Sequence, residues 1–345
     1  MANPTSPSSV YATMPKVELH RHLEGSLRLE TMLDIAREFG LTVPASLHRL
    51  SGLVQVQEHD PLTFQNFLAK FNTLRLFYRS PEIIQRVARE AIEDAARDNV
   101  RYMELRFTPV ALGRAESYPL QEVMGWVCAS AAGAAADHGM RIGLIASVNR
   151  HESTELAEQV AALAVDFRAQ GVVGMDLAGN EAEFSAEPFA GIFAGVRQDG
   201  LRLTIHAGEW AGAHNVREAI EVLGAERIGH GVRVMEDEAV VALSRERGTT
   251  FEVCVTSNYQ TGVVNDLDAH QLPAMLAAGL DVTINTDDPS VSNIDLSHEY
   301  ELVCERFGLS LEDIQGFVLA AARAAFLPPG EREALVGQLE AELGL

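Results

Sequence analysis

Short apolar segments rich in β-branched residues recur along the chain, and each ends in polar residues. There are eight, at 16–22, 100–107, 141–148, 172–179, 201–209, 227–232, 249–255 and 280–288. Such runs are typical of strands buried on both faces of a parallel sheet. Segments with helical spacing lie between them, at 120–139, 155–171, 186–200, 213–224, 237–248 and 266–279. Several of these end in glycine, a common helix stop.

Strands that alternate with helices predict βαβ units and a parallel sheet, so the expected class is α/β. Eight strands favour a closed (β/α)8 TIM barrel over an open doubly wound sheet. The open sheet would favour a GxGxxG phosphate turn after the first strand, where this chain has HRHLEGS. We therefore expect one barrel domain over residues 14–345. The Pro/Ser-rich residues 1–13 predict a flexible N-terminal tail.

The first connection, residues 26–98, is far longer than an ordinary crossover of about 10–12 residues. Three of its stretches have helical spacing: SLRLETMLDIAREFG, DPLTFQNFLAKFNTLRLFYRS and SPEIIQRVAREAIEDAARDN. Loops that follow barrel strands emerge at the catalytic face. We expect this helical insertion to cover that face as a lid or pocket wall; the alternative is a peripheral decoration.

Polar residues that could bind a metal or take part in catalysis lie at the ends of five predicted strands. They are His20-Arg21-His22, Asp176 to Glu181, His206 to Glu209, Gly229-His230-Gly231 and Asn285 to Pro289. In a barrel these strand ends meet at a single mouth. Four of the chain's 11 histidines fall on them, which indicates a common site.

Two of these histidines share one face of the first strand. His20 and His22 point the same way because a strand has a side-chain period of two, and Arg21 points the other way. An imidazole from His206 and a carboxylate from Asp287 would complete a nitrogen-rich donor set. That set suits Zn²⁺, with water in an open position and its pKa lowered toward about 7.

Each motif taken alone has a structural alternative. An HxH pair on a strand can be structural or exposed to solvent. NTDDP, residues 285–289, also fits a polar turn with an N-cap aspartate, and GHG, residues 229–231, fits a tight turn. Only their joint occurrence in barrel order favours a metal site.

Four further residues fit the chemistry around such a metal. Glu209 lies three residues after His206, so it can reach the site and shuttle protons without ligating. His230 can orient or deprotonate the metal-bound water. Asp288 directly follows a ligand and should face another partner, the substrate. Gly179 lacks a Cβ, so its backbone N–H can approach a flat ring.

Composition narrows the partners. Lys+Arg number 27 against 49 Asp+Glu, and the formal net charge of −22 disfavours nucleic acid and anionic membranes. No apolar run approaches the roughly 18 residues of a membrane span. Three dispersed cysteines without CxxC suit a reducing compartment, and the N-terminus carries no signal-peptide pattern. We expect a cytoplasmic protein that binds a small molecule; the pattern specifies no oligomeric state.

The motifs together resemble one known family. MPKVELHRHLEGS, DLAGNE, HAGE, GHG, SNxxTG (257–262) and NTDDPS occur in the order and spacing of the adenosine deaminase family, within the amidohydrolase superfamily. The likeness runs from about Met14 to Phe326 and includes FQNFLAKF in the insertion.

This resemblance implies one Zn²⁺ per chain, bound by His20, His22, His206 and Asp287 in a (β/α)8 barrel. It implies zinc-dependent hydrolytic deamination of adenosine to inosine and ammonia, by metal-bound hydroxide attack on C6 of the purine.

Roles for the remaining residues follow from the same resemblance. Glu209 would protonate N1 of the ring and His230 would assist the hydroxide. Asp288 would hydrogen-bond N7, and the Gly179 amide would meet N3.

Two absences favour a single metal and a small substrate. Binuclear members of the superfamily bridge their metals with a carboxylated lysine, but the only lysines here are Lys16 and Lys70, neither on the fourth strand. The zinc deaminases that act on nucleic acid bases use HxE and PCxxC, and this chain has no PCxxC.

Glu24 departs from the pattern of adenosine-specific members, which commonly have Asp at the residue that meets the ribose 5′-hydroxyl. Adenine deaminases of the family also carry Glu there, so adenine, 6-amino-6-deoxyfutalosine or another modified adenosine are alternative substrates. Glu24 can instead cap the helix that follows. A non-catalytic purine-binding barrel is the alternative from another class. The sequence assigns no role to Arg150, His151, Trp210 or His214.

Overall fold

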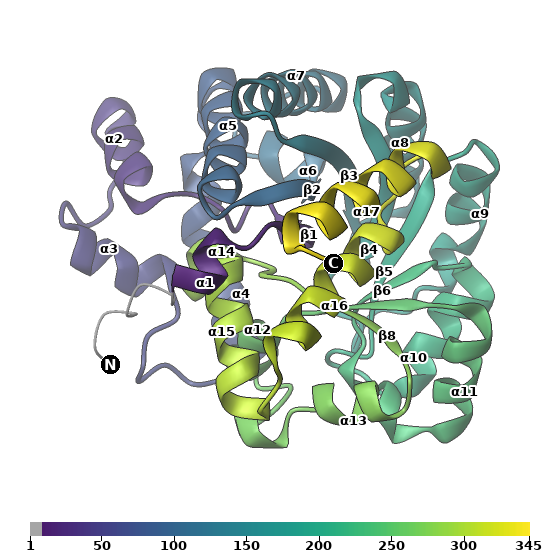
Figure 1. Cartoon of the computed structure of the whole chain (residues 1–345). Coiled ribbons are helices and arrows are strands. Elements are labelled where there is room, and N and C mark those ends of the chain that lie inside the picture. The colour runs from purple at the N-terminus through teal and green to yellow at the C-terminus, as the bar shows by residue number, and fades with distance from the viewer. Residues whose placement is uncertain (1–8) are drawn as a thin grey trace.

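The computed structural model describes residues 9–345 and confirms the (β/α)8 barrel (Figure 1). Its eight strands lie in the order β1 to β8, and each neighbouring pair from β1–β2 to β7–β8 is parallel. The strands are β1 (Lys16–His22), β2 (Val100–Phe107), β3 (Arg141–Asn149), β4 (Val172–Ala178), β5 (Arg202–Ala207), β6 (Arg227–His230), β7 (Thr250–Val253) and β8 (Asp281–Ile284). All eight coincide with predicted apolar segments, whose polar tails mostly form the loops that follow.

The barrel closes between β1 and the loop after β8, through a parallel bridge of Arg21 with Asp287. The backbone N–H of Asp287 donates to the carbonyl of His20, and the N–H of His22 donates to the carbonyl of Asp287, both at 2.8 Å. This closure inserts Asp287 between the two histidines of β1.

Helices between the strands form the outer ring: α5 (Pro81–Arg97), α7 (Leu120–His138), α8 (Thr154–Asp166), α9 (Ala190–Gln198), α10 (Ala213–Glu218), α11 (Glu238–Arg247), α13 (Leu272–Ala277) and α16 (Leu311–Ala324). Shorter or additional helices are α6 (Pro109–Gly113), α12 (Val255–Gln260), α14 (Pro289–Ser292), α15 (Leu296–Phe307) and α17 (Pro329–Leu343). In the described residues, no helix is long and apolar enough to cross a membrane.

The long first connection contains the expected helices, α2 (Leu29–Phe39), α3 (Leu47–Val54) and α4 (Phe64–Leu74), before α5. The last of the predicted stretches, α5, packs on β2 and α7 and therefore belongs to the ring. Ser80 caps it by accepting from the N–H of Ile83, with Pro81 in the first turn. The elements outside the ring are α2, α3 and α4, of which α2 and α3 stand out to the left in Figure 1.

The predicted tail differs from the structure in its last residues. Ser9–Thr13 form the short helix α1, which packs on α15. Ser297 Oγ donates to the Tyr11 carbonyl at 3.2 Å, and Met14 is buried, so this segment is held by the barrel. Residues 1–8, the rest of the predicted tail, lie outside the described residues.

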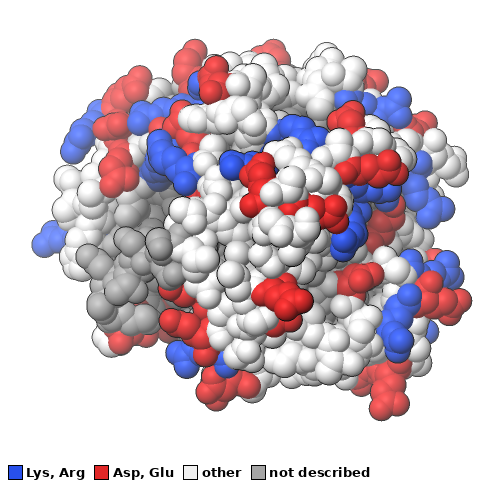
Figure 2. Space-filling model, in the orientation of Figure 1, with Lys and Arg blue, Asp and Glu red and all other residues white. Residues whose placement is uncertain are grey.

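Charged side chains occupy the middle of the barrel. Arg106 lies between Asp176, at 3.4 Å, and Glu252, at 2.8 Å. Arg227 pairs with Glu104 and, at 2.7 Å, with Glu252. All five are almost fully buried. Removing one partner from such a group leaves a buried unpaired charge, at a cost of about 3–5 kcal/mol. The outer surface, in contrast, carries interspersed acidic and basic residues on the face drawn in Figure 2.

Candidate active site

The strand ends converge on a small pocket at the mouth of the barrel. Its cavity is about 120 Å³. Eight of the nine site residues predicted from the sequence line it: His22, Glu24, Gly179, His206, Glu209, His230, Asp287 and Asp288. The ninth, His20, lies beneath the pocket and is fully buried.

Three imidazoles and one carboxylate face one point in this pocket. The Nε2 atoms of His20 and His22 each lie 3.3 Å from Oδ1 of Asp287. His22 Nε2 is 3.4 Å from His206 Nε2. His230 lies beside them, with Nε2 at 4.0 Å from Asp287 Oδ2. Four of these residues, His20, His206, His230 and Asp287, offer ligand atoms within 4.8 Å of one another.

Carboxylates behind two of the histidines determine which ring nitrogen faces the pocket. His20 Nδ1 is 2.9 Å from Glu252 Oε2, and His206 Nδ1 is 2.9 Å from Asp176 Oδ1. Each carboxylate accepts the Nδ1 proton, so the Nε2 lone pair is left for a metal. The buried Nε2 of His20 has no hydrogen-bond partner. The chemistry of this donor set fits a bound metal ion.

The electrostatics of the two supporting carboxylates agree with this arrangement. Burial raises the pKa of Asp176, but His206 and Arg106 outweigh it and hold that pKa below its usual range. For Glu252 the pKa also stays well below normal, since Arg106 and Arg227 outweigh burial. Both side chains are therefore ionised acceptors behind His20 and His206.

Two of the site residues adopt a backbone conformation that is uncommon outside glycine. His230 has φ +59° and Asp287 has φ +64°. Such residues persist only where their surroundings hold them, and they cluster at functional sites. Asp287 is held by the closure of the barrel and by Ser257, whose Oγ donates to Asp287 Oδ2 at 2.7 Å.

Two glycines make room for this cluster. A Cβ on Gly229 would lie 2.9 Å from Cε1 of His20 and 3.2 Å from Cγ of His206. One on Gly25 would lie 1.9 Å from Oδ1 of Asp288. The first glycine allows two imidazoles to meet across the barrel, and the second allows Asp288 to face the pocket.

Three carboxyl groups in the pocket are perturbed toward the neutral form. Burial, followed by the charges of Asp287 and Glu181, raises the pKa of Glu209 well above its usual value. Burial and the neighbouring Asp287 likewise raise the pKa of Asp288. Burial raises the pKa of Glu24 to about 7. Protonated carboxyls can donate hydrogen bonds, so these groups can face acceptor atoms of a ligand.

The insertion supplies the apolar wall of the pocket. Phe67, Leu68 and Phe71 of α4 line it. Phe64, at the start of the same helix, stacks on Trp210 with ring centroids 4.8 Å apart. Helix α4 therefore forms part of the pocket wall.

Glu24 does not cap the helix that follows it. The N-cap of α2 is Arg28, which has no side-chain cap, and Glu24 Oε1 accepts from the N–H of Thr108 at 2.6 Å. The other carboxyl oxygen, Oε2, is buried without a partner.

Of the four residues to which the sequence assigned no role, Arg150 and Trp210 lie at the site, and His151 and His214 do not line the pocket. Arg150 is buried and donates from Nη2 to the carbonyl of His206 at 2.6 Å, at the end of β5. Trp210 lines the pocket. His151 packs near Phe184, and His214 lies in a separate surface depression.

The family follows from comparison with known proteins. The family model described as adenosine deaminase matches residues 15–342. The chain belongs to the adenosine deaminase family. It is 39% identical to an adenosine deaminase of Erwinia tasmaniensis over 331 residues, covering 95% of this chain and 98% of that one. It is 38% identical to an adenosine deaminase of Klebsiella pneumoniae, covering 94% and 97%.

Three solved structures show the same fold. The adenine deaminase of Arthrobacter aurescens aligns with a TM-score of 0.87 at 26% identity, over 96% of this chain and 100% of that one. An amidohydrolase of Burkholderia ambifaria with bound Zn aligns at 0.86 and 25%, over 99% and 96%. Arabidopsis ADAL complexed with IMP aligns at 0.86 and 26%, over 97% and 98%.

Some members of the site were not predicted from the sequence. Glu252 lies in the apolar strand TFEV, and a buried acid in such a strand is the only local signal of its role. Asn258 belongs to the SNxxTG motif but had no assigned function, and His270 and Gly25 had none either. Their roles depend on contacts between distant segments.

Proposed function

We propose that this chain catalyses zinc-dependent hydrolytic deamination of adenosine to inosine and ammonia. One observation carries the proposal: a buried cluster of imidazoles and a carboxylate shares a small pocket with two carboxyl groups whose pKa burial raises toward the neutral form. A purine with an amino group at C6 has the complementary pattern of acceptors.

The ion is proposed to be one Zn²⁺ per chain, held by His20, His22, His206 and Asp287. Three imidazole nitrogens and one carboxylate oxygen form a borderline-soft set that zinc prefers. Bound there, zinc supplies a Lewis acid that lowers the pKa of a coordinated water toward about 7, so that hydroxide is available at neutral pH.

Recognition of the base rests on three hydrogen-bond donors. N1, N3 and N7 of adenine are all acceptors. A protonated Glu209 can donate to N1, a protonated Asp288 to N7, and the backbone N–H of Gly179 to N3. Gly179 has φ +90° and lies against Asn149 and Arg150. A side chain here would strain the backbone and crowd these two neighbours.

Glu209 is proposed to move the protons. Its proton goes to N1, which makes C6 more electrophilic when water oxygen adds there. One proton of the attacking water passes through Glu209 to the amino group, which leaves as ammonia. The second passes from the C6 hydroxyl to Glu209 as the carbonyl forms, and this restores the protonated acid. A carboxyl with a raised pKa suits both steps, because it is protonated before the reaction and can take a proton back from the attacking water.

The sugar side of the pocket is proposed to involve Glu24. Its buried, unpartnered Oε2 is available to a hydroxyl of the ligand. Arg75, which also lines the pocket, lies close enough to lower the pKa of Glu24. Adenine, 6-amino-6-deoxyfutalosine and other modified adenosines remain the alternative substrates for the same chemistry.

A panel of 6-aminopurines tests the proposal. Zinc-loaded protein is assayed by ultraviolet change and ammonia release with adenosine, adenine, AMP and 5′-substituted adenosines. Fast turnover of adenosine supports the proposal. If only another member of the panel is turned over, that compound is the substrate instead of adenosine. Tight purine binding without ammonia from any member would support the non-catalytic barrel. A cytoplasmic location and a small-molecule purine partner are part of the proposal.

A further inference from the structure

A chain of hydrogen bonds runs from the outer helix α13 to His230. The backbone N–H of Leu272 donates to Nδ1 of His270 at 3.0 Å. His270 Nε2 lies 3.3 Å from Oδ1 of Asn258, and Asn258 Nδ2 lies 3.1 Å from Nδ1 of His230. All three side chains are buried, with at most 4% of each residue exposed.

The direction of this chain is determined at its outer end. A backbone N–H can only donate, so Nδ1 of His270 must accept and the ring proton must be on Nε2. Burial lowers the pKa of His270 to about 4, which keeps the ring neutral at working pH. Nε2–H then donates to Oδ1 of Asn258, which orients the amide so that its NH₂ donates to Nδ1 of His230.

The consequence for His230 concerns its other nitrogen. Because Nδ1 accepts a hydrogen bond, a neutral His230 carries its proton on Nε2. That N–H points into the pocket, 3.7 Å from Glu209 Oε2 and 4.0 Å from Asp287 Oδ2. In this tautomer His230 has no lone pair toward the pocket, so it neither ligates a metal nor accepts a proton there.

We propose that Asn258 and His270 are positioning residues that hold His230 as the Nε2–H tautomer, so that it donates a hydrogen bond to the oxygen attacking C6. The proposal rests on the proposed deamination for its catalytic meaning. The sequence left two roles for His230, to orient the attacking water or to deprotonate it. The proposal selects the first role and makes Glu209 the group that carries the protons. It also leaves His22, rather than His230, as the third imidazole ligand.

The decisive variant is Asn258→Asp, which has nearly the same shape. Its carboxylate can still accept from His270 but can only accept from His230, so the proton of His230 should move to Nδ1. A wrong tautomer at a catalytic histidine costs about 10⁴-fold in kcat in a serine protease triad, so we expect a loss of roughly 10²–10⁴-fold. KM should change little, since Asn258 does not line the pocket.

A matched pair at the outer end separates positioning from packing. His270→Gln keeps a donor toward Asn258, whereas His270→Phe removes it and retains a ring of similar size. We expect the Phe variant to lose about 10-fold in kcat, as for other supporting residues, and the Gln variant to restore most of it. Bound zinc should remain one per chain in both.

Nitrogen NMR of the imidazole side chains tests the proposal without any substrate. In the wild-type zinc-loaded protein, correlation spectra of ¹⁵N-histidine should assign the proton of His230 to Nε2, and in Asn258→Asp to Nδ1. A wild-type His230 protonated on Nδ1, or an unchanged tautomer and kcat in a folded Asn258→Asp variant, would overturn the proposal. Should that variant not fold, the wild-type spectrum alone decides. Failure of the substrate panel would leave this spectrum unaffected, so the two proposals fail separately.

Discussion

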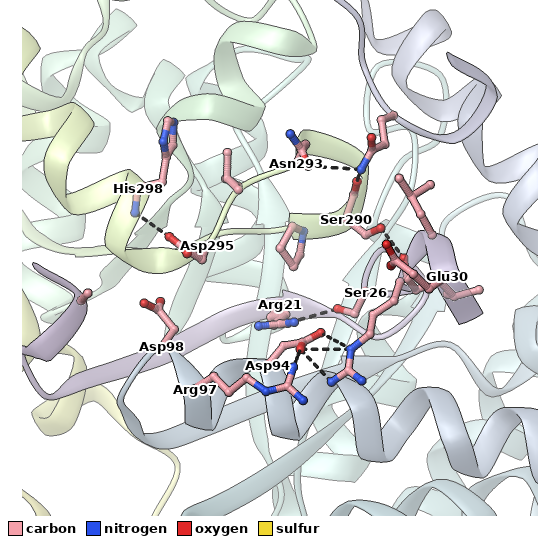
Figure 3. A pocket seen from close by; sticks show the side chains of 17 residues that line it. Arg21, Ser26, Glu30, Asp94, Arg97, Asp98, Ser290, Asn293, Asp295 and His298 are labelled. Atoms are coloured by element: carbon pink, nitrogen blue, oxygen red, sulfur yellow. Dashed lines mark hydrogen bonds and ion pairs between the residues drawn. The ribbon is translucent and has the colours of Figure 1, made fainter. Parts of the chain in front are cut away.

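Two cavities lie on opposite faces of strand β1, and the smaller one is the candidate active site. The inward face carries His20 and His22 toward the pocket of about 120 Å³. The outward face carries Arg21 toward a cavity of about 660 Å³ between α5, α14 and α15, which we call the outer cavity (Figure 3). The side-chain period of a strand separates them within three residues.

The two cavities differ in whether the buried polar atoms of their lining residues have hydrogen-bond partners. In the outer cavity Arg28 and Arg97 both pair with Asp94 at 2.7 Å, and Arg21 Nε donates to Ser26 at 3.1 Å (Figure 3). Among the described residues, no lining residue of this cavity has a buried side-chain nitrogen or oxygen without a partner.

The small pocket shows the opposite. Glu24 Oε2, Asp288 Oδ1 and Trp210 Nε1 are buried without partners. Leaving a buried polar group unsatisfied costs about 1–3 kcal/mol. Unmet hydrogen bonds, rather than volume, therefore mark the place where a ligand belongs.

The largest expected effect comes from removing a ligand in the small pocket. His206→Ala should lose the metal and at least about 10⁴-fold in kcat/KM, because in the proposed function the ion would supply the nucleophile. Zinc per chain, measured by elemental analysis, should fall together with activity. The matched control is His298→Ala, a histidine of the outer cavity, which should keep both. Full zinc content in His206→Ala would remove this residue from the ligand set.

Glu209→Gln should separate binding from turnover. The amide is the same size but cannot exchange a proton, so kcat should fall by about 10²–10⁴-fold while zinc and purine binding persist. Calorimetry with purine riboside and steady-state kinetics measure the two quantities. Normal turnover in this variant would show that the protons move by another route.

The pH dependence should follow the raised pKa of Glu209. Since the protonated acid is required and its pKa is raised, activity is present at neutral pH and is lost as the pH rises through that value. We expect kcat/KM to fall about 10-fold per pH unit on that limb. As a control, Asp288→Asn keeps a hydrogen-bond donor for the purine and should show the same fall in kcat/KM at alkaline pH. A flat alkaline profile in the wild type would contradict a neutral Glu209.

Gly25→Ala should damage the small pocket without touching a ligand. Its Cβ would lie 1.9 Å from Asp288 Oδ1, so the carboxyl must move. A displacement of about 1 Å in a positioning group can cost roughly 10²-fold, and we expect a 10–100-fold loss of kcat/KM. Gly52→Ala, on α3 with nothing within 4 Å, is the control; it should keep activity and add about 0.5–1 kcal/mol of stability. Equal kinetics in the two variants would mean that Asp288 does not position the substrate.

The smallest effect is expected in the outer cavity. Arg28→Ala removes a partly exposed pair with Asp94, so the free energy of unfolding should fall by about 0.5–1 kcal/mol. Denaturant unfolding measures this change, and kcat/KM should equal that of the wild type. A large loss of activity here would give the outer cavity a functional role and break the comparison.

The strands and much of the site were predictable from local pattern. The apolar runs gave the strands, and the period of two placed His20 and His22 on one face. Barrel topology then brought His206, His230 and Asp287 to the same mouth, because parallel strands share a carboxyl end.

The rest depends on contacts that no local pattern encodes. The helix α5 reads like the insertion helices but belongs to the ring, because its apolar face meets β2 and α7. Glu252 supports His20 from β7, far away in the sequence, and Gly25 matters only because Asp288 packs against it. Ser9–Thr13 look like a tail by composition, yet they form a helix that contacts α15.

A crystal structure of the zinc-loaded protein with purine riboside, an adenosine that lacks the 6-amino group, tests the central claim most directly. We expect the purine in the small pocket, with N1 at Glu209, N7 at Asp288 and the metal beside C6. A purine in the outer cavity, or one in the small pocket with C6 turned away from the histidines, would contradict it.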